Sequence, residues 1–383
     1  MPRIAVVIDP WAHPFNGTVV SARRFVAALE RRGYAFRLLA IAGSFAAGDS
    51  RGVAFPRLSI PGVNGIIDRM RAPLARPQRA RLRAALEGCD LLHVQFPFFL
   101  GHAAIREAHR LGLPVVCSFH VQPENILNNI GINSALVSRW LYRLLVRAFY
   151  NRADEVIAPS AFAANLLRDN GVTRPITVVS NGVPAVFFQP HGEPAGDRLR
   201  VLSVGRLASE KRHDVLLQAV ASSAFRSRIE LTIAGVGPRE ASLKALARTL
   251  GVRASIGRVD DAGLLQAYAD ADLVVHTGTA ELEGMSVLEA MAAGNTVLVS
   301  DAAESACAHF ITVPRCRFRS GDAVSLRAAL DDWLADARGR RVMGDSNRFQ
   351  AHALAHEKSV DRLVDLYTRM LGGAHPAAQV GGA

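Results

Sequence analysis

Short apolar runs alternate with helical segments along both halves of this 383-residue chain. In the first half, strands are predicted at residues 4–8, 34–41, 91–95, 114–119, 155–158 and 176–179, with helices such as 19–32 and 103–111 between some of them. In the second half, strands at 200–204, 230–234, 273–276 and 296–300 are separated by helices at 214–224, 241–250 and 264–269. Such alternation predicts an α/β fold with two doubly wound parallel sheets.

The chain is too long for one ordinary domain and suits two α/β domains of somewhat under roughly two hundred residues each. We predict a first domain over residues 1–182, a proline- and glycine-containing linker over 183–199, and a second domain over 200–357. A final helix is predicted over 358–371. The Gly- and Ala-rich tail, 372–383, is predicted to be disordered.

The hydrophobic content of 50% supplies a sizeable core without any apparent membrane-spanning segment. No stretch approaches about 20 uninterrupted apolar residues, and the apolar run at 4–8 is too short for a signal peptide. We therefore expect a cytoplasmic protein. The cysteines stand at unrelated spacings in mostly apolar surroundings, which predicts buried, reduced thiols rather than disulfides or a zinc site. They are Cys89, Cys117, Cys307 and Cys316.

Positive charge is concentrated in the N-terminal half, which carries the whole net excess of +11. Many of its arginines lie within residues 57–83, and a second cluster, Arg139, Arg143 and Arg147, forms one stripe of a helix predicted over 134–150. Such a helix either lies on an anionic bilayer or packs on its own domain with its arginines in water. Nucleic acid is a weaker partner, because no zinc finger, helix-turn-helix or aromatic stacking set accompanies the charge.

Two carboxylates eight positions apart, Glu281 and Glu289, frame a glycine in the sequence Glu-Leu-Glu-Gly-Met-Ser-Val-Leu-Glu. A helix is predicted over residues 286–293, so residues 284–286 form the turn that opens it. Free backbone N–H groups at such a turn favour an anion or sugar hydroxyls, and the carboxylates can accept hydrogen bonds from further hydroxyls. The layout predicts a sugar-binding site. The simpler alternative is that the acidic residues only cap the helix.

Arg206 and Lys211 follow the strand predicted at residues 200–204. An arginine can make two parallel hydrogen bonds to phosphate oxygens, and a lysine adds a compact point charge. Together they could neutralise the negative charge that grows on a departing diphosphate. Lysine is rare in this arginine-rich chain and otherwise occurs only at Lys244 and Lys358. The alternative is that both are ordinary surface charges after a strand.

These two segments resemble the signature of glycosyltransferase family 4, the group 1 glycosyltransferases, which are retaining enzymes of the GT-B fold. Residues 281–289 match the family's E-x7-E motif, and residues 205–211 match its G-R-L-x-x-x-K segment. The resemblance implies two Rossmann-like domains that face each other across a cleft, with the last helix crossing back to the first domain. It also implies that Arg206 and Lys211 clamp the donor diphosphate, that Glu281 contacts the transferred sugar, and that Glu289 contacts the ribose.

The resemblance assigns roles to residues after other predicted strands. Gly17 looks like the family's phosphate-binding glycine loop, although the family often has two adjacent glycines there. His120 stands where members carry a histidine that faces the sugar, whereas a lone histidine is more often structural. Gly235 resembles the family's G-x-G-P turn near the nucleotide, and Val259 lies where members hold the base through backbone atoms. The implied substrate contacts are Gly17, Gly235, Val259, Gly284, Met285, Ser286 and Glu289.

Several motifs of other enzyme classes are absent or misplaced. Asp270 and Asp272 resemble the D-x-D metal motif of the other major glycosyltransferase fold, but they lie between a helix and a strand, at the amino edge of the sheet. We predict that they are structural and expect no metal or other cofactor, with positive side chains in place of the cation. The chain lacks Gly-x-Gly-x-x-Gly after its first strand and lacks a Gly-x-x-x-x-Gly-Lys-Ser/Thr loop, which argues against a dehydrogenase and a nucleoside triphosphatase.

The resemblance therefore implies a metal-independent, retaining transferase that moves a hexose from a UDP- or GDP-sugar to a hydroxyl acceptor. Its predicted catalytic residues are Arg206, Lys211, Glu281 and His120. Residues 118–129 and 281–286 look similar to branches that act on diacylglycerol or cell-surface glycans, which predicts a lipid, lipid-linked or glycan acceptor and peripheral contact with the inner face of the plasma membrane. The alternatives are an epimerase or phosphorylase on the same fold, and a non-catalytic sugar-binding or membrane-tethering module.

Overall fold

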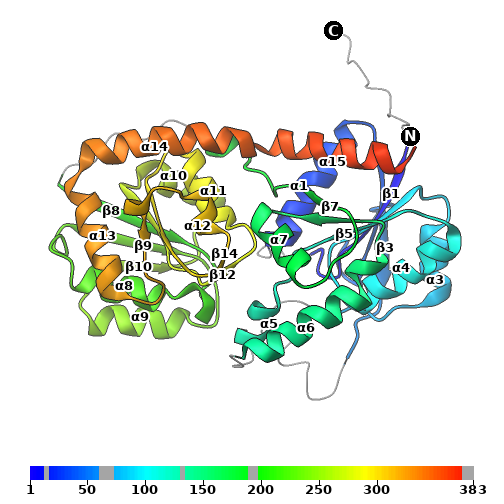
Figure 1. Cartoon of the computed structure of the whole chain (residues 1–383), viewed down its shortest axis with the longest axis horizontal. Coiled ribbons are helices and arrows are strands. Elements are labelled where there is room, and N and C mark those ends of the chain that lie inside the picture. The colour runs from blue at the N-terminus through cyan, green and yellow to red at the C-terminus, as the bar shows by residue number, and fades with distance from the viewer. Residues whose placement is uncertain (13–16, 60–72, 130–133, 189–196, 373–383) are drawn as a thin grey trace, which may run out of the picture. The chain divides into compact units, whose positions relative to one another are not determined.

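The computed structural model describes residues 1–12, 17–59, 73–129, 134–188 and 197–372. These residues form two compact units. The first unit runs to Asn181 and includes the C-terminal segment from Ser359 onward, and the second unit is Gly182–Lys358. The C-terminal helix, red in Figure 1, therefore contributes most of its length to the first unit. The tail predicted to be disordered lies outside the described residues from residue 373 onward.

The first unit is built on a seven-stranded parallel sheet with the strand order β3-β2-β1-β4-β5-β6-β7. The strands are β1 (Arg3–Val7), β2 (Ala35–Ile41), β3 (Gly52–Phe55), β4 (Leu91–Val94), β5 (Val115–Ser118), β6 (Glu155–Ala158) and β7 (Ile176–Val178). The helices are α1 (Gly17–Arg31), α3 (Arg79–Leu86), α4 (Phe99–Leu111), α5 (Pro123–Asn129), α6 (Ala135–Ala148), α7 (Ala161–Asp169) and α15 (His356–Met370).

The second unit has a six-stranded parallel sheet with the order β10-β9-β8-β11-β13-β15 and a separate parallel pair, β12-β14. Its strands are β8 (Leu199–Val204), β9 (Ile229–Ala234), β10 (Ala254–Gly257), β11 (Leu273–His276), β12 (Ala280–Glu281), β13 (Val297–Ser300), β14 (Glu304–Ser305) and β15 (Arg317–Phe318). Its α-helices are α8 (His213–Ala221), α9 (Glu240–Thr249), α10 (Asp261–Asp270), α11 (Met285–Ala292), α12 (Cys307–Phe310), α13 (Ala323–Ala335) and α14 (Ala337–Ala351).

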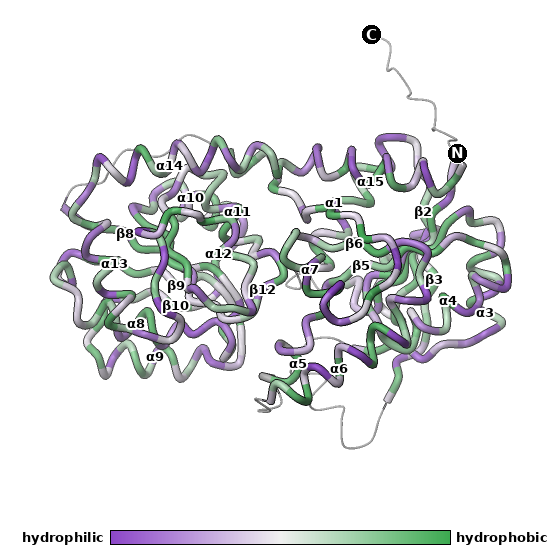
Figure 2. Tube along the Cα trace, viewed as in Figure 1, coloured by the Kyte–Doolittle hydropathy of each residue, from purple (hydrophilic) through white to green (hydrophobic). Residues whose placement is uncertain are grey.

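The strands form where the sequence is continuously apolar, because both faces of a parallel sheet are covered. All four residues are buried in β4, β5, β11 and β13. In Figure 2 the strands within each unit are mostly hydrophobic, whereas the helices alternate along their length. Helix α15 follows the second pattern, since its buried residues include Val360, Leu363 and Tyr367, which pack into the core of the first unit.

The predicted pair of parallel α/β sheets is confirmed. Within the predicted linker, Val183 and Phe187 are buried in the core of the second unit, and residues 189–196 lie outside the described residues. All four cysteines are free and buried, as predicted. None of the helices in the described part of the chain has the length and apolar composition that crossing a bilayer requires.

Candidate active site

The second sheet places two of the predicted motifs at one edge. Strands β8 and β11 are neighbours, and the strand order reverses between them. Ligands of open parallel α/β sheets bind beyond the carboxyl ends of the strands at such a reversal. Arg206 and Lys211 follow β8, and Glu281 follows β11. The fold therefore brings these residues to the position in the second unit where a ligand is expected.

Hydrogen bonds fasten the loop after β8 to the loop after β11. The hydroxyl of Thr277 donates to the carbonyl of Lys211 at 2.6 Å, and the backbone N–H of Thr279 donates to the carbonyl of Glu210 at 2.9 Å. With the two loops joined in this way, the Lys211 ammonium pairs directly with the Glu281 carboxylate. Both side chains are only 16% exposed, so the pair is largely shielded from bulk water.

A buried carboxylate orients the predicted arginine. The side chain of Glu210 is buried and accepts a hydrogen bond from Nη2 of Arg206, whose own side chain is 40% exposed. The guanidinium is thus held at one end and accessible at the other. Such an arrangement suits an anionic ligand, because a fixed guanidinium loses little freedom when it binds.

Burial also sets the protonation states at this edge. It lowers the pKa of the Lys211 ammonium to about 8, and it lowers the pKa of His276 well below the usual value. His276 ends β11, and its Nε2 lies 3.3 Å from Oε1 of Glu281. Near neutral pH this histidine is therefore uncharged, and the positive charge available to a ligand comes from Lys211 and Arg206.

Two glycines allow the loops after β8 and β9 to approach each other closely. A Cβ added to Gly235 would lie 1.9 Å from the carbonyl oxygen of Gly205, and one added to Gly237 would lie 2.3 Å from that of Leu207. Only glycine fits at such distances, so Gly235 has a packing role in addition to its predicted contact with substrate. Val259 follows β10 and packs against the core of the second unit.

The turn before α11 also requires a glycine. Gly284 has φ 83°, and a Cβ there would lie 2.3 Å from Sγ of Cys307. Met285 and Ser286 form the first turn of α11 and are partly exposed. The predicted glycine turn and helix start are therefore present.

Glu289 lies one turn into α11 and is held by a tyrosine that the sequence did not single out. The hydroxyl of Tyr268, a buried residue of α10, lies 3.2 Å from Oε2 of Glu289 and 3.2 Å from the carbonyl of Ser286. Since Glu289 is only partly buried, Tyr268 orients its carboxylate without covering it completely.

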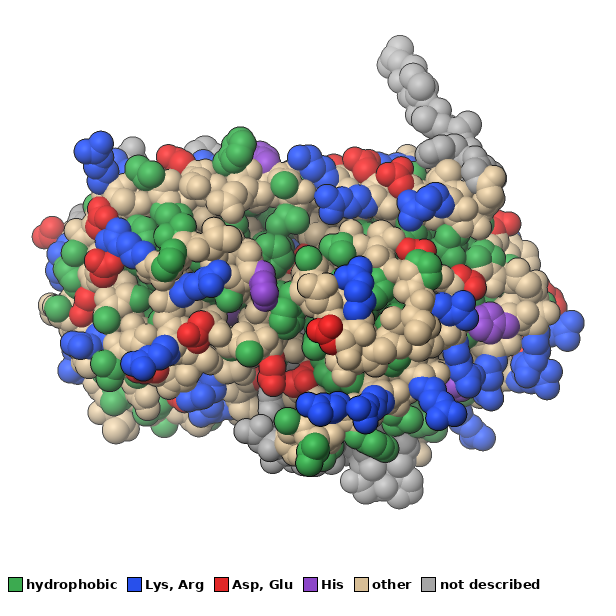
Figure 3. All heavy atoms as spheres, viewed as in Figure 1, with side chains coloured by type: hydrophobic (Ala, Val, Ile, Leu, Met, Phe, Trp, Pro, Cys, Tyr) green, Lys and Arg blue, Asp and Glu red, His purple; other side chains and the backbone are tan. Residues whose placement is uncertain are grey.

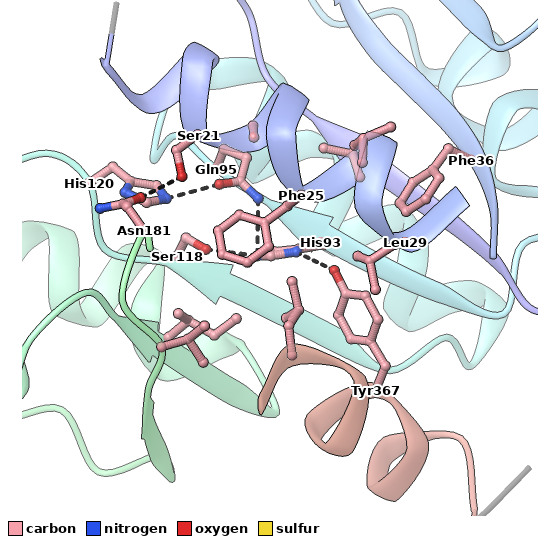
Figure 4. Close-up of a pocket in the computed structure, with 16 residues that line it drawn as sticks. Ser21, Phe25, Leu29, Phe36, His93, Gln95, Ser118, His120, Asn181 and Tyr367 are labelled. Carbon is pink, nitrogen blue, oxygen red and sulfur yellow. Dashed lines mark hydrogen bonds between the residues drawn. The ribbon is translucent and has the colours of Figure 1, made fainter. Parts of the chain in front are cut away.

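The remaining predicted residues belong to the first unit. Gly17 opens α1 and is exposed, and the preceding residues 13–16 lie outside the described residues. His120 follows β5 and lines a pocket, where its Nε2 lies 2.9 Å from Oε1 of Gln95 (Figure 4). Burial lowers the pKa of His120 to about 4, so the imidazole is neutral at physiological pH.

Sequence reasoning missed the residues that orient the predicted ones. In the second unit these are Glu210 and Tyr268, and in the first unit Gln95. His276 was also missed; its Nε2 lies near Glu281 but makes no hydrogen bond within the described residues. The available signal was position: His276 ends a strand at the carboxyl edge, as His120 follows one. Glu210 lies inside the motif but was not given a role.

The two aspartates of the D-x-D sequence make structural contacts at the amino edge of the sheet. Asp272 accepts a hydrogen bond from the backbone N–H of Arg200 at 2.8 Å, and Asp270 lies 3.3 Å from the guanidinium of Arg200. Asp272 also lies 3.5 Å from the guanidinium of Arg340. Both carboxylates therefore help to hold the starts of β8 and β11.

Known structures share this architecture of two parallel α/β units. Sucrose-phosphate synthase from Thermosynechococcus elongatus has a TM-score of 0.78 at 17% identity, over 98% of this chain and 100% of that one. HepE of Anabaena, solved in complex with UDP-glucose, has a TM-score of 0.75 at 16% identity, over 96% and 100% of the two chains. At these identities the likeness shows the fold, which is GT-B.

The family follows from two matching family models and from the sequences of curated relatives. Residues 15–186 match the model described as Glycosyltransferase Family 4, and residues 187–350 match Glycosyl transferases group 1. A GDP-mannose-dependent alpha-mannosyltransferase from Mycobacterium tuberculosis is 30% identical over 320 residues, 78% of this chain and 79% of that protein. Alpha-monoglucosyldiacylglycerol synthase from Streptococcus pneumoniae is 27% identical over 315 residues, 77% and 70% of the two chains. The chain belongs to glycosyltransferase family 4, the group 1 glycosyltransferases, and is a glycosyltransferase.

Proposed function

We propose that this glycosyltransferase moves a hexose from a GDP- or UDP-sugar to a membrane-associated hydroxyl acceptor, with retention at the anomeric carbon and without a metal ion. The observation that carries the proposal is the meeting of Arg206, Lys211 and Glu281 at the strand-order reversal of the second sheet. Two cations and a carboxylate there match the two ends of a nucleotide sugar, a diphosphate and a set of hydroxyls.

In the proposed reaction the acceptor oxygen forms a bond to the anomeric carbon while the bond from that carbon to the phosphate oxygen breaks. The proton of the acceptor hydroxyl passes to the departing diphosphate on the same face. Arg206 and Lys211 stabilise the charge on the diphosphate, as a metal ion does in other enzymes. Glu281 and the backbone amides after Gly284 orient the sugar, and His120 remains a predicted contact to a hydroxyl of the substrate. Orientation and charge stabilisation then supply most of the rate acceleration.

The ion pair between Lys211 and Glu281 links the two ends of the donor. A diphosphate competes with the Glu281 carboxylate for the Lys211 ammonium. When the diphosphate replaces the carboxylate as the partner of Lys211, Glu281 can accept hydrogen bonds from sugar hydroxyls. A complete nucleotide sugar can satisfy both groups. A nucleoside diphosphate without a sugar satisfies only Lys211, so we expect the sugar to add to the affinity through Glu281.

The relatives indicate which donors and acceptors should be tested first. The mycobacterial relative is named for its dependence on GDP-mannose, and the pneumococcal one for the synthesis of a glucosyldiacylglycerol. We therefore place GDP-mannose and UDP-glucose first among donors. Diacylglycerol and glycosylated lipids come first among acceptors.

Helix α6 supports a membrane acceptor. Leu136, Trp140 and Leu144 recur every fourth residue and are 77%, 63% and 47% exposed. With the neighbouring Arg139, Arg143 and Arg147 they define the α6 surface, and the helix contains no acidic residue. Figure 3 shows basic and hydrophobic side chains gathered over α6 in the first unit. An exposed apolar stripe beside arginines complements a bilayer that contains anionic lipids.

The α6 surface is tested by flotation with vesicles of phosphatidylcholine and phosphatidylglycerol. We expect the protein to float with these vesicles and not with phosphatidylcholine alone, and Trp140→Ala with Leu144→Ala should abolish flotation. Phe349→Ala is the matched control, since Phe349 is 81% exposed on α14 in the second unit. Wild-type protein that stays at the bottom of the gradient would remove the membrane contact from the proposal.

Transfer itself is tested by the release of nucleoside diphosphate from a panel of UDP- and GDP-sugars in the presence of EDTA, with and without lipid vesicles or soluble glycans. The proposal predicts release that needs one donor and one acceptor. Consumption of donor without any acceptor would indicate an epimerase instead. Bound nucleotide with no release from any pair would favour a non-catalytic binding module.

A further inference from the structure

Four polar side chains in the first unit form a continuous series of hydrogen bonds that ends at His120 (Figure 4). Oη of Tyr367 lies 2.6 Å from Nδ1 of His93, and Nε2 of His93 lies 3.1 Å from Nε2 of Gln95. Oε1 of Gln95 lies 2.9 Å from Nε2 of His120. We call this series the Tyr367 relay. It begins on the C-terminal helix α15 and crosses the carboxyl ends of β4 and β5.

The Gln95 carboxamide gives the relay a direction. Its nitrogen can only donate, so Nε2 of His93 accepts, and the Ser118 hydroxyl, 2.7 Å from the same nitrogen, must donate to it as well. The proton of that neutral ring then lies on Nδ1, from which it is donated to Oη of Tyr367. Its oxygen can only accept, so Nε2 of His120 carries a proton. Nδ1 of His120 then has a lone pair, and it has no hydrogen-bond partner among the described residues.

Burial keeps the relay in this state. His93, Gln95 and Tyr367 are all at most 6% exposed. Burial lowers the pKa of His93 to about 3, so the ring does not take a second proton near neutral pH. Tyr367 is held by ring contacts with Tyr34 and His93, each with a centroid separation of 5.9 Å. Beside the relay is a cavity of about 30 Å³, with room for one or two water molecules. A water molecule there can accept a hydrogen bond from the Tyr367 hydroxyl.

We propose that Tyr367 is a positioning residue for His120: through His93 and Gln95 it keeps the His120 proton on Nε2 and presents Nδ1 as a hydrogen-bond acceptor to a hydroxyl of the substrate. A residue near the C-terminus thereby determines which ring nitrogen of a predicted catalytic histidine carries the proton. The relay itself is independent of the proposed function. Only its effect on turnover rests on that function.

Removal of the tyrosine hydroxyl should invert the relay. In Tyr367→Phe, Nδ1–H of His93 has no acceptor, and a buried donor without a partner is unfavourable. The His93 proton moves to Nε2, where the Ser118 hydroxyl, 2.7 Å away, can accept it. The Gln95 carboxamide then turns over and donates to Nε2 of His120, whose proton moves to Nδ1.

The test is ¹⁵N NMR of the full-length protein with labelled histidine, since the nitrogen shift separates protonated from bare ring nitrogens. His120→Gln identifies the His120 signals. We expect bare Nδ1 and protonated Nε2 in the wild type, and the reverse in Tyr367→Phe. Tyr34→Phe is the matched control, because it removes a neighbouring hydroxyl that takes no part in the relay and should leave the His120 signals unchanged.

Turnover is measured on the same variants. If Nδ1 accepts a substrate hydroxyl, Tyr367→Phe should lower kcat/KM about five- to tenfold, the loss typical of one hydrogen bond, while Tyr34→Phe stays near wild type. A wild-type His120 protonated on Nδ1, or His120 signals unchanged in Tyr367→Phe, would overturn the relay. An inverted tautomer with no turnover in any protein, wild type included, would confirm the relay and count against the proposed transfer reaction.

Discussion

The carboxyl edges of the two sheets carry opposite kinds of polar groups. In the second unit the edge is ionic: Lys211 pairs with Glu281, and Arg206 pairs with Glu210. In the first unit the histidines of this edge are neutral, since His93 and His120 have pKa values lowered to about 3 and 4 by burial. Both edges occur where the strand order reverses, between β8 and β11 in one sheet and between β1 and β4 in the other.

This difference indicates that the two units, although alike in architecture, suit different parts of the substrates. Paired charges of both signs suit a polyanionic ligand, because phosphate can replace a carboxylate as the partner of a cation. A neutral hydrogen-bonded network suits hydroxyl groups, for which the direction of donation matters more than charge. If this is correct, changes at the ionic edge should affect nucleotide binding, and changes at the neutral edge should affect orientation and stability.

The largest expected effect is that of Lys211→Ala on turnover. In the proposed reaction the ammonium stabilises the leaving diphosphate, so on its loss we expect kcat to fall about 10²- to 10³-fold, as for the loss of an oxyanion donor. Lys244→Ala is the matched control, because Lys244 pairs with Glu240 on the same helix and is 49% exposed. Steady-state release of nucleoside diphosphate measures both variants. Turnover of Lys211→Ala close to wild type would remove this lysine from the site.

The buried carboxylate of Asp9 in the first unit should make the stability of the protein depend on pH. Asp9 follows β1, accepts a hydrogen bond from the Ala75 N–H at 2.8 Å, and has no partner for Oδ2 within the described residues. Burial raises its pKa to about 7, so the folded state binds the proton more tightly than the unfolded state. The free energy of unfolding should therefore fall as pH rises from about 4 to about 7.

Asp9→Asn removes that dependence and keeps an acceptor for the Ala75 N–H. We expect it to stabilise the protein on the order of 2–4 kcal/mol at pH 8 relative to wild type, because each pKa unit corresponds to about 1.4 kcal/mol. At pH 4 the two proteins should be similar. Urea titrations at the two pH values measure the difference. An equal effect of the substitution at both would show that the charge of Asp9 is not responsible.

Nucleotide affinity should depend on pH through the lysine of the ionic edge. Burial lowers the pKa of Lys211 to about 8, so the ammonium is present below that pH and is lost as pH rises through it. We expect GDP or UDP affinity to fall up to about tenfold per pH unit above pH 8, with a bound diphosphate moving the onset upward. Lys211→Arg stays charged to beyond about pH 12 and should lose this dependence whatever its absolute affinity. Titration calorimetry between pH 7 and 10 decides between these outcomes.

The smallest expected effect concerns the residue after that lysine. Arg212 has φ 47° and ψ 37°, and among the described residues it alone has a positive φ without being a glycine. Arg212→Gly relieves this conformation and should stabilise the protein by about 0.5–1 kcal/mol, less the weak pairing of Arg212 with Asp214. Thermal unfolding measures the change. A clear loss of stability would mean that the arginine contributes contacts worth more than its strain.

The sequence predicted the residues that bear charge better than the contacts between them. The E-x7-E and G-R-L-x-x-x-K segments pointed to Glu281 and Lys211, but the two residues are 70 positions apart and pair where Thr277 and Thr279 fasten one loop to the other. Hydroxyl groups in loops give no periodic signal. The link therefore became visible only in three dimensions.

The neutral edge was harder to predict for the same reason. His93 and Tyr367 are separated by 274 positions, and within their own segments both have the pattern of core residues, one on a buried strand and the other on an amphipathic helix.

The strands themselves were predicted correctly where the apolar runs are continuous, as at β4, β6 and β11. Strand β3 and helix α3 were missed, because they lie beside an arginine- and proline-rich stretch with little apolar periodicity.

The most direct test of this difference between the two units is the affinity of GDP and UDP for the wild type, Lys211→Ala and His120→Ala, measured by titration calorimetry at pH 7. If the ionic edge of the second unit binds the diphosphate, Lys211→Ala should weaken the preferred nucleotide at least about tenfold, and His120→Ala should bind it as the wild type does. Unchanged affinity in Lys211→Ala, or an equal loss in His120→Ala, would contradict the account.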